Sequence, residues 1–215
     1  MSMPREAIRG LYAITPDEQD TDNLLKRVRL ALQGGARVLQ YRNKSASSFL
    51  KLAQAVQLRR LTREFSVPLI INDDMALAMQ VDADGVHLGE TDGSLVAARK
   101  FLGADKMIGV SCYNRFSLAR DAKVRGADYV AFGAFFASSI KPAAPIATIA
   151  LLHEARRELK LPIVAIGGIT ADNGVRLLDA GADALAVISA LFAADDVLLA
   201  ARKFSDMNFD KKDAT

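Results

Sequence analysis

The sequence predicts a single-domain α/β fold in which eight parallel strands alternate with helices, and three observations predict it. Short apolar runs rich in β-branched residues alternate eight times with segments of helical spacing. Successive runs begin about 25 residues apart on average, which is enough for a strand, a helix and two short connections. Related short sequence motifs, called words below, also recur before every second apolar run. Eight such units favour a short (βα)8 TIM barrel. An open doubly wound sheet satisfies the same alternation and is the alternative fold.

The apolar runs define the expected strands, and helical spacing defines several of the segments between them. The expected strands span residues 11–15, 37–42, 68–73, 85–89, 107–111, 129–136, 162–169 and 184–191. The expected helices include residues 23–33, 47–63, 114–124, 148–159 and 173–180. Pro68 and Pro162 stand at the first strand position, where proline is tolerated.

An internal repeat precedes the second, fourth, sixth and eighth expected strands. Its words are Gly35-Ala36-Arg37, Asp82-Ala83-Asp84, Gly126-Ala127-Asp128 and Gly181-Ala182-Asp183. A glycine that ends the preceding helix in a left-handed cap explains the three words that open with Gly. The repeat indicates a recurring unit of two β-α modules.

Composition places the 215 residues in one soluble domain, with a core over residues 11–204 and a polar tail at 205–215 that we expect to fray. Apolar residues make up 51%, and 28 Lys and Arg against 25 Asp and Glu leave a charge of only +3, too little to indicate nucleic-acid binding. No run approaches a membrane span, and the first ten residues lack the apolar segment of a secretory signal. A single cysteine, Cys112, excludes a disulfide framework and fits a reducing compartment. We therefore expect a cytoplasmic protein without nucleic-acid or membrane partners.

The second expected strand ends in polar residues that suit an anion. Alternation turns Gln40 and Arg42 to one side, and Lys44 follows just beyond. Arginine offers a bidentate fork and lysine a point charge, a combination suited to phosphate or diphosphate oxygens. A solvated strand face is the alternative interpretation, which is weaker inside a barrel because both strand faces are covered there.

Carboxylates follow the third and fourth expected strands. Asp73 and Asp92 end neighbouring strands, where they would share one divalent cation, with Mg2+ favoured because it takes one or two carboxylates together with substrate phosphate. Helix capping is an equal alternative, since Asp73, Asp74 and Asp92 each stand just ahead of a plausible helix.

The fifth and sixth expected strands lead to further polar candidates. Ser111 ends the fifth strand as a hydroxyl donor, and with no base near it in the sequence we do not expect a nucleophile. Lys141 lies in a long loop that is a candidate lid over an anionic substrate, with an ordinary exposed lysine as the alternative. We expect Cys112 and His87 to be packed in the core, and His153 to lie on a solvated helix face.

The seventh and eighth expected strands end in a candidate phosphate pocket. Gly167 and Gly168 expose backbone amides after the seventh strand, and further amides follow the eighth. Many barrels bind phosphate after their last two strands in this way.

Taken together, five words on the second, third, fourth, fifth and seventh expected strands resemble the thiamine-phosphate synthase family. The words are Gln40-Tyr41-Arg42-Asn43-Lys44, Ile71-Asn72-Asp73-Asp74, Asp84-Gly85-Val86-His87-Leu88-Gly89-Glu90-Thr91-Asp92, Gly109-Val110-Ser111 and Ala165-Ile166-Gly167-Gly168-Ile169. The resemblance covers residues 11–204 and implies a TIM-barrel transferase of thiamine biosynthesis. Such an enzyme joins 4-amino-5-hydroxymethyl-2-methylpyrimidine diphosphate to 4-methyl-5-(2-phosphooxyethyl)thiazole, releases diphosphate and requires Mg2+.

The resemblance also implies roles for individual residues. Contacts to the pyrimidine diphosphate would come from Gln40, Arg42, Lys44, Asn72, Ser111 and Lys141, of which Arg42, Lys44, Ser111 and Lys141 are the expected catalytic residues. The metal carboxylates would be Asp73 and Asp92, and the thiazole phosphate would lie against Ser138, Gly168, Ile188 and Ser189. The expected partners are these small molecules, and a homodimer is the candidate assembly.

The chain departs from the family pattern at a few positions. Ala134, Ser138 and Ile140 stand where the sixth loop commonly has a proline and two threonines, so one hydrogen bond to substrate phosphate is in doubt. Glu90 replaces a more usual glutamine, and its charge would either tighten Mg2+ binding or repel diphosphate. A thiazole tautomerase of the related regulator-like group and a non-catalytic thiazole-phosphate-binding protein are the alternative functions.

Overall fold

Parallel strands form a closed barrel in the computed structural model, which describes residues 7–90, 93–136 and 146–209. Each strand pairs with the next along the chain, and the last pairs with the first through Gly10 opposite Ala184. The strands are β1 Gly10–Ile14, β2 Val38–Tyr41, β3 Leu69–Asn72, β4 Gly85–Leu88, β5 Met107–Tyr113, β6 Tyr129–Phe132, β7 Ile163–Ile166 and β8 Ala184–Val187. This closure confirms the (βα)8 prediction and excludes the open sheet.

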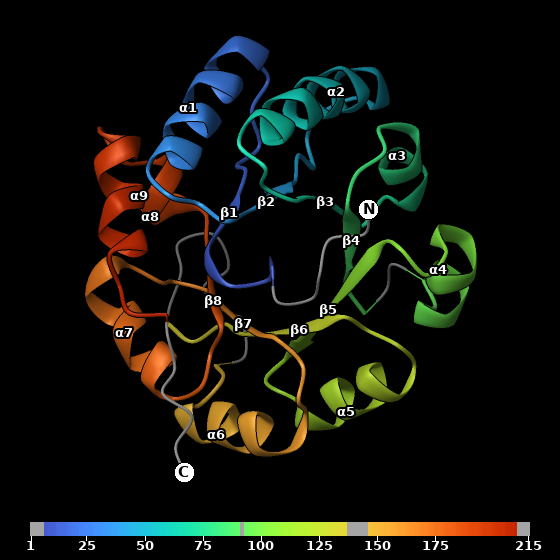
Figure 1. Ribbon diagram of the computed structural model, residues 1–215, viewed down its shortest axis with the longest axis vertical. Helices are drawn as coiled ribbons and strands as arrows, with labels where there is room; N and C mark the ends of the chain where they lie inside the picture. The colour runs from blue at the N-terminus through green and yellow to red at the C-terminus, as the bar shows by residue number, and fades with distance from the viewer. Residues whose placement is uncertain (1–6, 91–92, 137–145, 210–215) are drawn as a thin grey trace.

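Helices form a ring outside the strands, as Figure 1 shows in a view along the barrel. They are α1 Thr21–Gln33, α2 Ser48–Glu64, α3 Met75–Gln80, α4 Leu95–Leu102, α5 Phe116–Val124, α6 Ile149–Glu158, α7 Ala171–Asp179, α8 Ser189–Phe192 and α9 Val197–Ser205. The strands are mostly apolar on both faces because this ring covers their outer face while side chains fill the barrel interior.

Three expected strands extend three or four residues too far at their carboxyl ends. The sixth ends at Phe132 and the seventh at Ile166, while the chain after Val187 turns into α8. A short apolar run does not distinguish a strand from a buried helical turn, which explains the error over residues 188–191. The chain beyond α9 also differs from expectation, because Arg9 Nε donates to the carbonyl oxygen of Phe209 at 3.0 Å and so holds residues 206–209.

The core has two layers, one inside the barrel and one between the strands and the helices. The inner layer includes Tyr12, Ile70, Tyr129 and Val164, all at most 1% exposed. Tyr129 fits because Gly109 faces it, where a Cβ atom would lie only 2.0 Å from the Tyr129 Cζ atom. The outer layer is larger and mainly aliphatic.

The recurring words before the even-numbered strands hold the barrel together at the end where the strands begin. In three of them the aspartate accepts a hydrogen bond from the first or second residue of the preceding odd-numbered strand and pairs with an arginine of the helix that comes before that odd-numbered strand. These Asp–Arg clamps are Asp84 with Leu69 N (2.8 Å) and Arg59 (2.6 Å), Asp128 with Ile108 N (2.8 Å) and Arg99 (2.5 Å), and Asp183 with Ile163 N (2.8 Å) and Arg156 (3.3 Å). The repeat is thus a structural device, and only the first word, Gly35-Ala36-Arg37, has an arginine in place of the aspartate.

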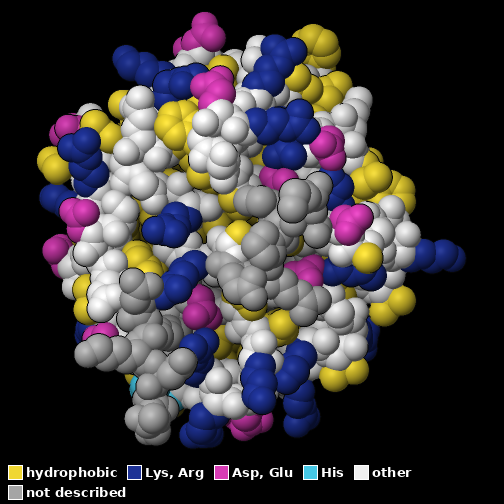
Figure 2. Space-filling model, viewed as in Figure 1, with side chains coloured by type: hydrophobic (Ala, Val, Ile, Leu, Met, Phe, Trp, Pro, Cys, Tyr) yellow, Lys and Arg dark blue, Asp and Glu magenta, His cyan; other side chains and the backbone are white. Residues whose placement is uncertain are grey.

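Charged side chains are dispersed over the face seen in Figure 2, where Lys and Arg are interspersed with Asp and Glu. Within the described ranges, none of the helices combines the length and the apolar character that crossing a bilayer requires.

Candidate active site

The predicted site residues within the described ranges lie at the carboxyl ends of the strands, the end of a (βα)8 barrel that carries active sites. Gln40 is the penultimate residue of β2, Asn72 is the last residue of β3, and Ser111 lies near the end of β5. Parallel pairing brings these strand ends to a common rim. Lys141, Ser138 and Asp92 are outside the described residues, as is Ile140.

A carboxylate from the loop after β1 organises the two cations that follow β2. Asp17 Oδ1 accepts hydrogen bonds from the Arg42 guanidinium at 3.1 Å and from the Lys44 backbone N–H at 2.9 Å. The Arg42 backbone is held in turn by the Thr15 hydroxyl, which accepts from Arg42 N at 2.9 Å. Asp17 was not among the predicted site residues, and its only sequence signal is its place after an apolar run that ends in Thr15.

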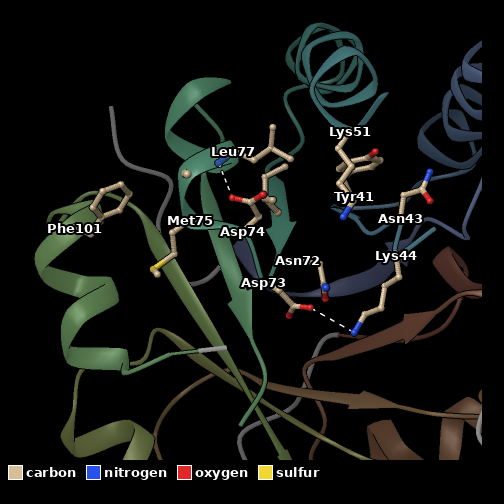
Figure 3. Close-up of a pocket in the computed structure, with 12 residues that line it drawn as sticks. Tyr41, Asn43, Lys44, Lys51, Asn72, Asp73, Asp74, Met75, Leu77 and Phe101 are labelled. Carbon is tan, nitrogen blue, oxygen red and sulfur yellow. Dashed lines mark hydrogen bonds and ion pairs between the residues drawn. The ribbon is translucent and has the colours of Figure 1, made fainter. Parts of the chain in front are cut away.

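Asp73 lies directly beyond β3 in a strained backbone conformation. Its φ angle is 63°, in the left-handed region that few residues other than glycine, asparagine and aspartate adopt. The Asp73 N–H donates to the carbonyl oxygen of His87 at 2.9 Å, which fixes the residue against β4. Lys44 Nζ lies 3.5 Å from Asp73 Oδ2, as Figure 3 shows. Strain of this kind at a strand end is typical of functional positions.

A cavity of about 510 Å³ opens beside this pair. Lys44, Asn72 and Asp73 line its polar side, and Met75 and Phe101 line its apolar side (Figure 3). The cavity therefore offers a cation, a carboxylate and an amide next to a hydrophobic wall.

Helix capping, the alternative interpretation of the acidic residues, holds for Asp74 alone among those described. Asp74 is the N-cap of α3 and accepts a hydrogen bond from Leu77 N at 2.8 Å. Asp73 precedes the cap and directs its carboxylate to Lys44 (Figure 3). Ser94 is the N-cap of α4.

Ser111 has a histidine neighbour in space, although no base lies near it in the sequence. His87 Nε2 lies 2.9 Å from Ser111 Oγ, and His87 Nδ1 lies 3.1 Å from the Tyr129 hydroxyl. The residues are 24 positions apart in the sequence and meet because β4 pairs with β5. A register shift between Ser111 and Tyr113 re-aims the end of β5 at this point. His87 is packed and hydrogen-bonded, as predicted, with 8% of its surface exposed.

Two other predicted features have clear outcomes. Cys112 is buried, as predicted, and burial raises the pKa of its thiol to about 12, which leaves it protonated and unreactive at neutral pH. Glu90 faces Arg115, whose guanidinium donates to its carboxylate at 2.6 Å. This pairing neutralises the extra charge that distinguishes Glu90 from the usual glutamine.

The ends of β7 and β8 differ from the rest of the rim in having little side-chain charge. Gly167 and Gly168 both have positive φ angles, 100° and 64°, which a side chain would disfavour. Ile188 is the N-cap of α8, and Ser189 is its first residue. This part of the rim therefore presents mainly backbone, and at Gly167 that backbone passes so close to Ala134 that a Cβ atom would lie 2.4 Å from the Ala134 Cβ.

The described residues contain no cluster of three or more His, Cys, Asp or Glu side chains that would hold a metal ion by itself. Asp73 offers hard carboxylate oxygens beside the Asn72 amide, a donor type that Mg2+ accepts when substrate and water complete its shell.

Comparisons with known proteins agree with this geometry. Residues 11–191 match the family described as thiamine monophosphate synthase. The thiamine-phosphate synthase of Methylobacillus flagellatus is 58% identical over 200 residues, which cover 93% of this chain and 95% of that protein. The thiamine-phosphate synthase of Nitrosomonas eutropha is 52% identical over 205 residues, 95% of this chain and 97% of that protein. Among solved structures, thiamine phosphate pyrophosphorylase from Pyrococcus furiosus superimposes with a TM-score of 0.83 at 35% identity, covering 93% of this chain and 95% of that one. The chain therefore belongs to the thiamine-phosphate synthase family of transferases.

Proposed function

We propose that the chain joins the pyrimidine diphosphate to the thiazole phosphate to give thiamine phosphate and diphosphate. The observation that carries this proposal is the cluster of Arg42, Lys44 and Asp73 at the ends of β2 and β3. A tautomerase that acts on the thiazole phosphate alone has no need of cations and a carboxylate gathered for a diphosphate.

The diphosphate half of the site lies over β2 to β5. Arg42 and Lys44 would bind the diphosphate oxygens, because an arginine fork and a lysine ammonium suit the leaving group's dispersed charge. Asn72 and Ser111 would add neutral hydrogen bonds, and Gln40 would contact the pyrimidine. Lys141 would supply a further cation from the loop after β6.

Asp73 and Asp92 would hold Mg2+ together with diphosphate oxygens. Lys44 Nζ lies 3.5 Å from Asp73 Oδ2, and this distance supports the metal proposal. The Asp73 carboxylate then lies beside a cation and also faces the expected position of the diphosphate. When bound, Mg2+ supplies positive charge that stabilises the leaving group.

The thiazole phosphate would occupy the other half, against Gly168, the Ile188–Ser189 backbone and the Ser138 hydroxyl. The left-handed backbone at Gly167 and Gly168 supports this assignment, because amides without side chains allow close approach of a phosphate.

In the mechanism that we propose, the C–O bond between the pyrimidine methylene carbon and the diphosphate breaks first, and its electron pair leaves on the diphosphate oxygen. Arg42 and Lys44 stabilise the charge that grows there. The electron-rich aminopyrimidine stabilises the resulting cation, and the thiazole nitrogen then donates its lone pair to form the new C–N bond. No protein nucleophile takes part.

Two further proposals concern the setting of the reaction. Met79 on α3 and Val96 and Phe101 on α4 are between 44% and 58% exposed, which supports a homodimer that buries them. Light scattering of the purified chain tests this assembly. The charged substrates support a cytoplasmic location, which cell fractionation tests.

An assay for diphosphate tests the function directly. Both substrates with Mg2+ should release diphosphate, and a chelator should abolish the release. Activity that persists in the chelator contradicts the metal proposal. The absence of any product from well-folded protein that still binds thiazole phosphate contradicts the proposed function and favours a non-catalytic binding protein.

A further inference from the structure

A continuous row of buried polar groups crosses the barrel interior. Gln40 Nε2 lies 2.8 Å from the Tyr12 hydroxyl, which lies 2.8 Å from the Tyr129 hydroxyl. The Tyr129 hydroxyl lies 3.1 Å from His87 Nδ1, and His87 Nε2 lies 2.9 Å from Ser111 Oγ. Both ends of the row are predicted substrate contacts, whereas Tyr12, Tyr129 and His87 have no assigned role.

One hydrogen-bond direction gives every proton within the row an acceptor, and it starts at Gln40. With the Gln40 amide nitrogen donating to Tyr12, the buried Tyr12 proton has an acceptor within the row only when it points to Tyr129, and the Tyr129 proton then points to His87 Nδ1. A neutral ring that accepts at Nδ1 carries its proton on Nε2 and donates it to Ser111 Oγ. The Ser111 proton is then directed away from His87, which makes Ser111 a donor to a ligand at the rim.

Packing holds the row in place. Gln40, Tyr12 and Tyr129 are 3%, 1% and 0% exposed, and Gly109 leaves the space that the Tyr129 ring fills. The Tyr129 ring is tilted against both of its neighbours, with centroids 6.1 Å from Tyr12 and 5.5 Å from His87. Burial raises the pKa of Tyr12 and Tyr129, so both phenols keep their protons at neutral pH.

We propose that Tyr12, Tyr129 and His87 are positioning residues that hold Gln40 and Ser111 in the orientation needed to bind the pyrimidine substrate. Gln40 presents its carbonyl oxygen as an acceptor, suited to the exocyclic amino group of an aminopyrimidine, and Ser111 presents its hydroxyl as a donor. This inference rests on the proposed function for the identity of the ligand, but the hydrogen-bond direction does not depend on it.

The direction of the row is tested by 15N NMR of the histidine side chains. The chain has two histidines, and His153 on the exposed face of α6 provides an internal reference. His87 should carry its proton on Nε2, and Tyr129→Phe, which removes the donor to Nδ1, should give a mixture of tautomers. Tyr41→Phe is the matched control: it removes a buried hydroxyl that donates to Gln54 outside the row, and should leave the His87 tautomer unchanged. A proton on Nδ1 in the unsubstituted protein, or no change in Tyr129→Phe, overturns the proposal.

The effect on binding is tested by steady-state kinetics of Tyr12→Phe and Tyr129→Phe. Each should raise the KM for the pyrimidine diphosphate about fivefold to tenfold, the usual effect of one lost hydrogen bond. The KM for the thiazole phosphate should change by less than about twofold, since that ligand is assigned to β7 and β8. Equal changes in both KM values, or none in either, overturn the positioning role. If the unsubstituted protein releases no diphosphate, the proposed function fails, and the NMR measurement still decides the direction of the row.

Discussion

Lys44 Nζ lies 3.5 Å from Asp73 Oδ2, so a cation predicted to bind diphosphate and a carboxylate predicted to bind metal are adjacent. The two residues follow neighbouring strands, and Asp17 fixes the backbone of Lys44 from a third loop. Each partner reduces the electrostatic cost of holding the other at the rim. When Mg2+ and diphosphate bind together, the metal would replace Lys44 as the partner of Asp73, and the diphosphate would replace Asp73 as the partner of Lys44.

Asp73→Asn is expected to reduce turnover by about 100-fold or more, because the amide lacks the charge that holds Mg2+. The fold should stay intact, since asparagine tolerates the φ angle of 63° at this position. Diphosphate release over a range of Mg2+ concentrations measures the effect. A variant that remains fully active without Mg2+ would refute the metal assignment.

Lys44→Gln is expected to raise the KM for the pyrimidine diphosphate about tenfold, as the loss of one charged contact implies. Its stability should change by less than about 1 kcal/mol, because the ion pair with Asp73 is partly exposed. Lys26→Gln, at an exposed position of α1, is the control for loss of one positive charge. A similar KM change in both variants would show that net charge, and not the Lys44 contact, is responsible.

Asp128→Asn is expected to reduce the free energy of unfolding by about 2–4 kcal/mol, because it leaves Arg99 without its buried partner. Denaturant unfolding measures the loss. Asp121→Asn breaks an exposed ion pair with Arg125 and should cost less than about 0.5 kcal/mol. Equal losses in the two variants would contradict the role assigned to the Asp–Arg clamps.

Alkaline pH is expected to destabilise the protein partly through Cys112. Its pKa is about 12 in the folded state and 9.0 as a reference, so the folded state binds the thiol proton more tightly. The contribution is complete below pH 9.0 and is lost as the pH rises toward about 12. Burial also raises the pKa of Tyr12 and Tyr129, so these tyrosines lower the free energy of unfolding in the same way as the pH rises. The free energy of unfolding of Cys112→Ala should therefore fall less steeply with pH in this range, and parallel curves would contradict the prediction.

Glu90→Gln is expected to leave the Mg2+ concentration for half-maximal activity within about twofold of its original value, because Arg115 already neutralises this carboxylate. Titration of activity with Mg2+ measures it. A large shift in either direction would mean that Glu90 acts on the metal in spite of its partner. Arg115→Gln, which frees the carboxylate, provides the opposite perturbation.

Much of the barrel was predictable because the strands are short, mostly apolar runs, and nearly all of them begin at or just after a glycine or a proline. Boundaries failed where an apolar run continued beyond the strand, as at Ile188, since a buried helical turn has the same composition. The repeated words located helix ends correctly, but their aspartates act through arginines about 25 to 30 positions away, a distance that local pattern analysis does not reach.

The same limit applies to the candidate site. The rim positions of Gln40, Arg42, Asp73 and Ser111 followed from strand ends alone. The partnership of His87 with Ser111 depends on side-chain direction and on the register shift in β5, which no local motif encodes. Asp17 escaped notice for a similar reason, because its role depends on the backbone of a different loop.

The Asp–Arg clamps fasten the barrel at the end opposite the ligand rim, and this separation has a consequence for evolvability. Loops at the carboxyl ends of the strands can lengthen, shorten or change in sequence without disturbing the Asp–Arg clamps. A chain built in this way is suited to acquiring new substrates by exchange of these loops, because the clamped end of the barrel stays unchanged.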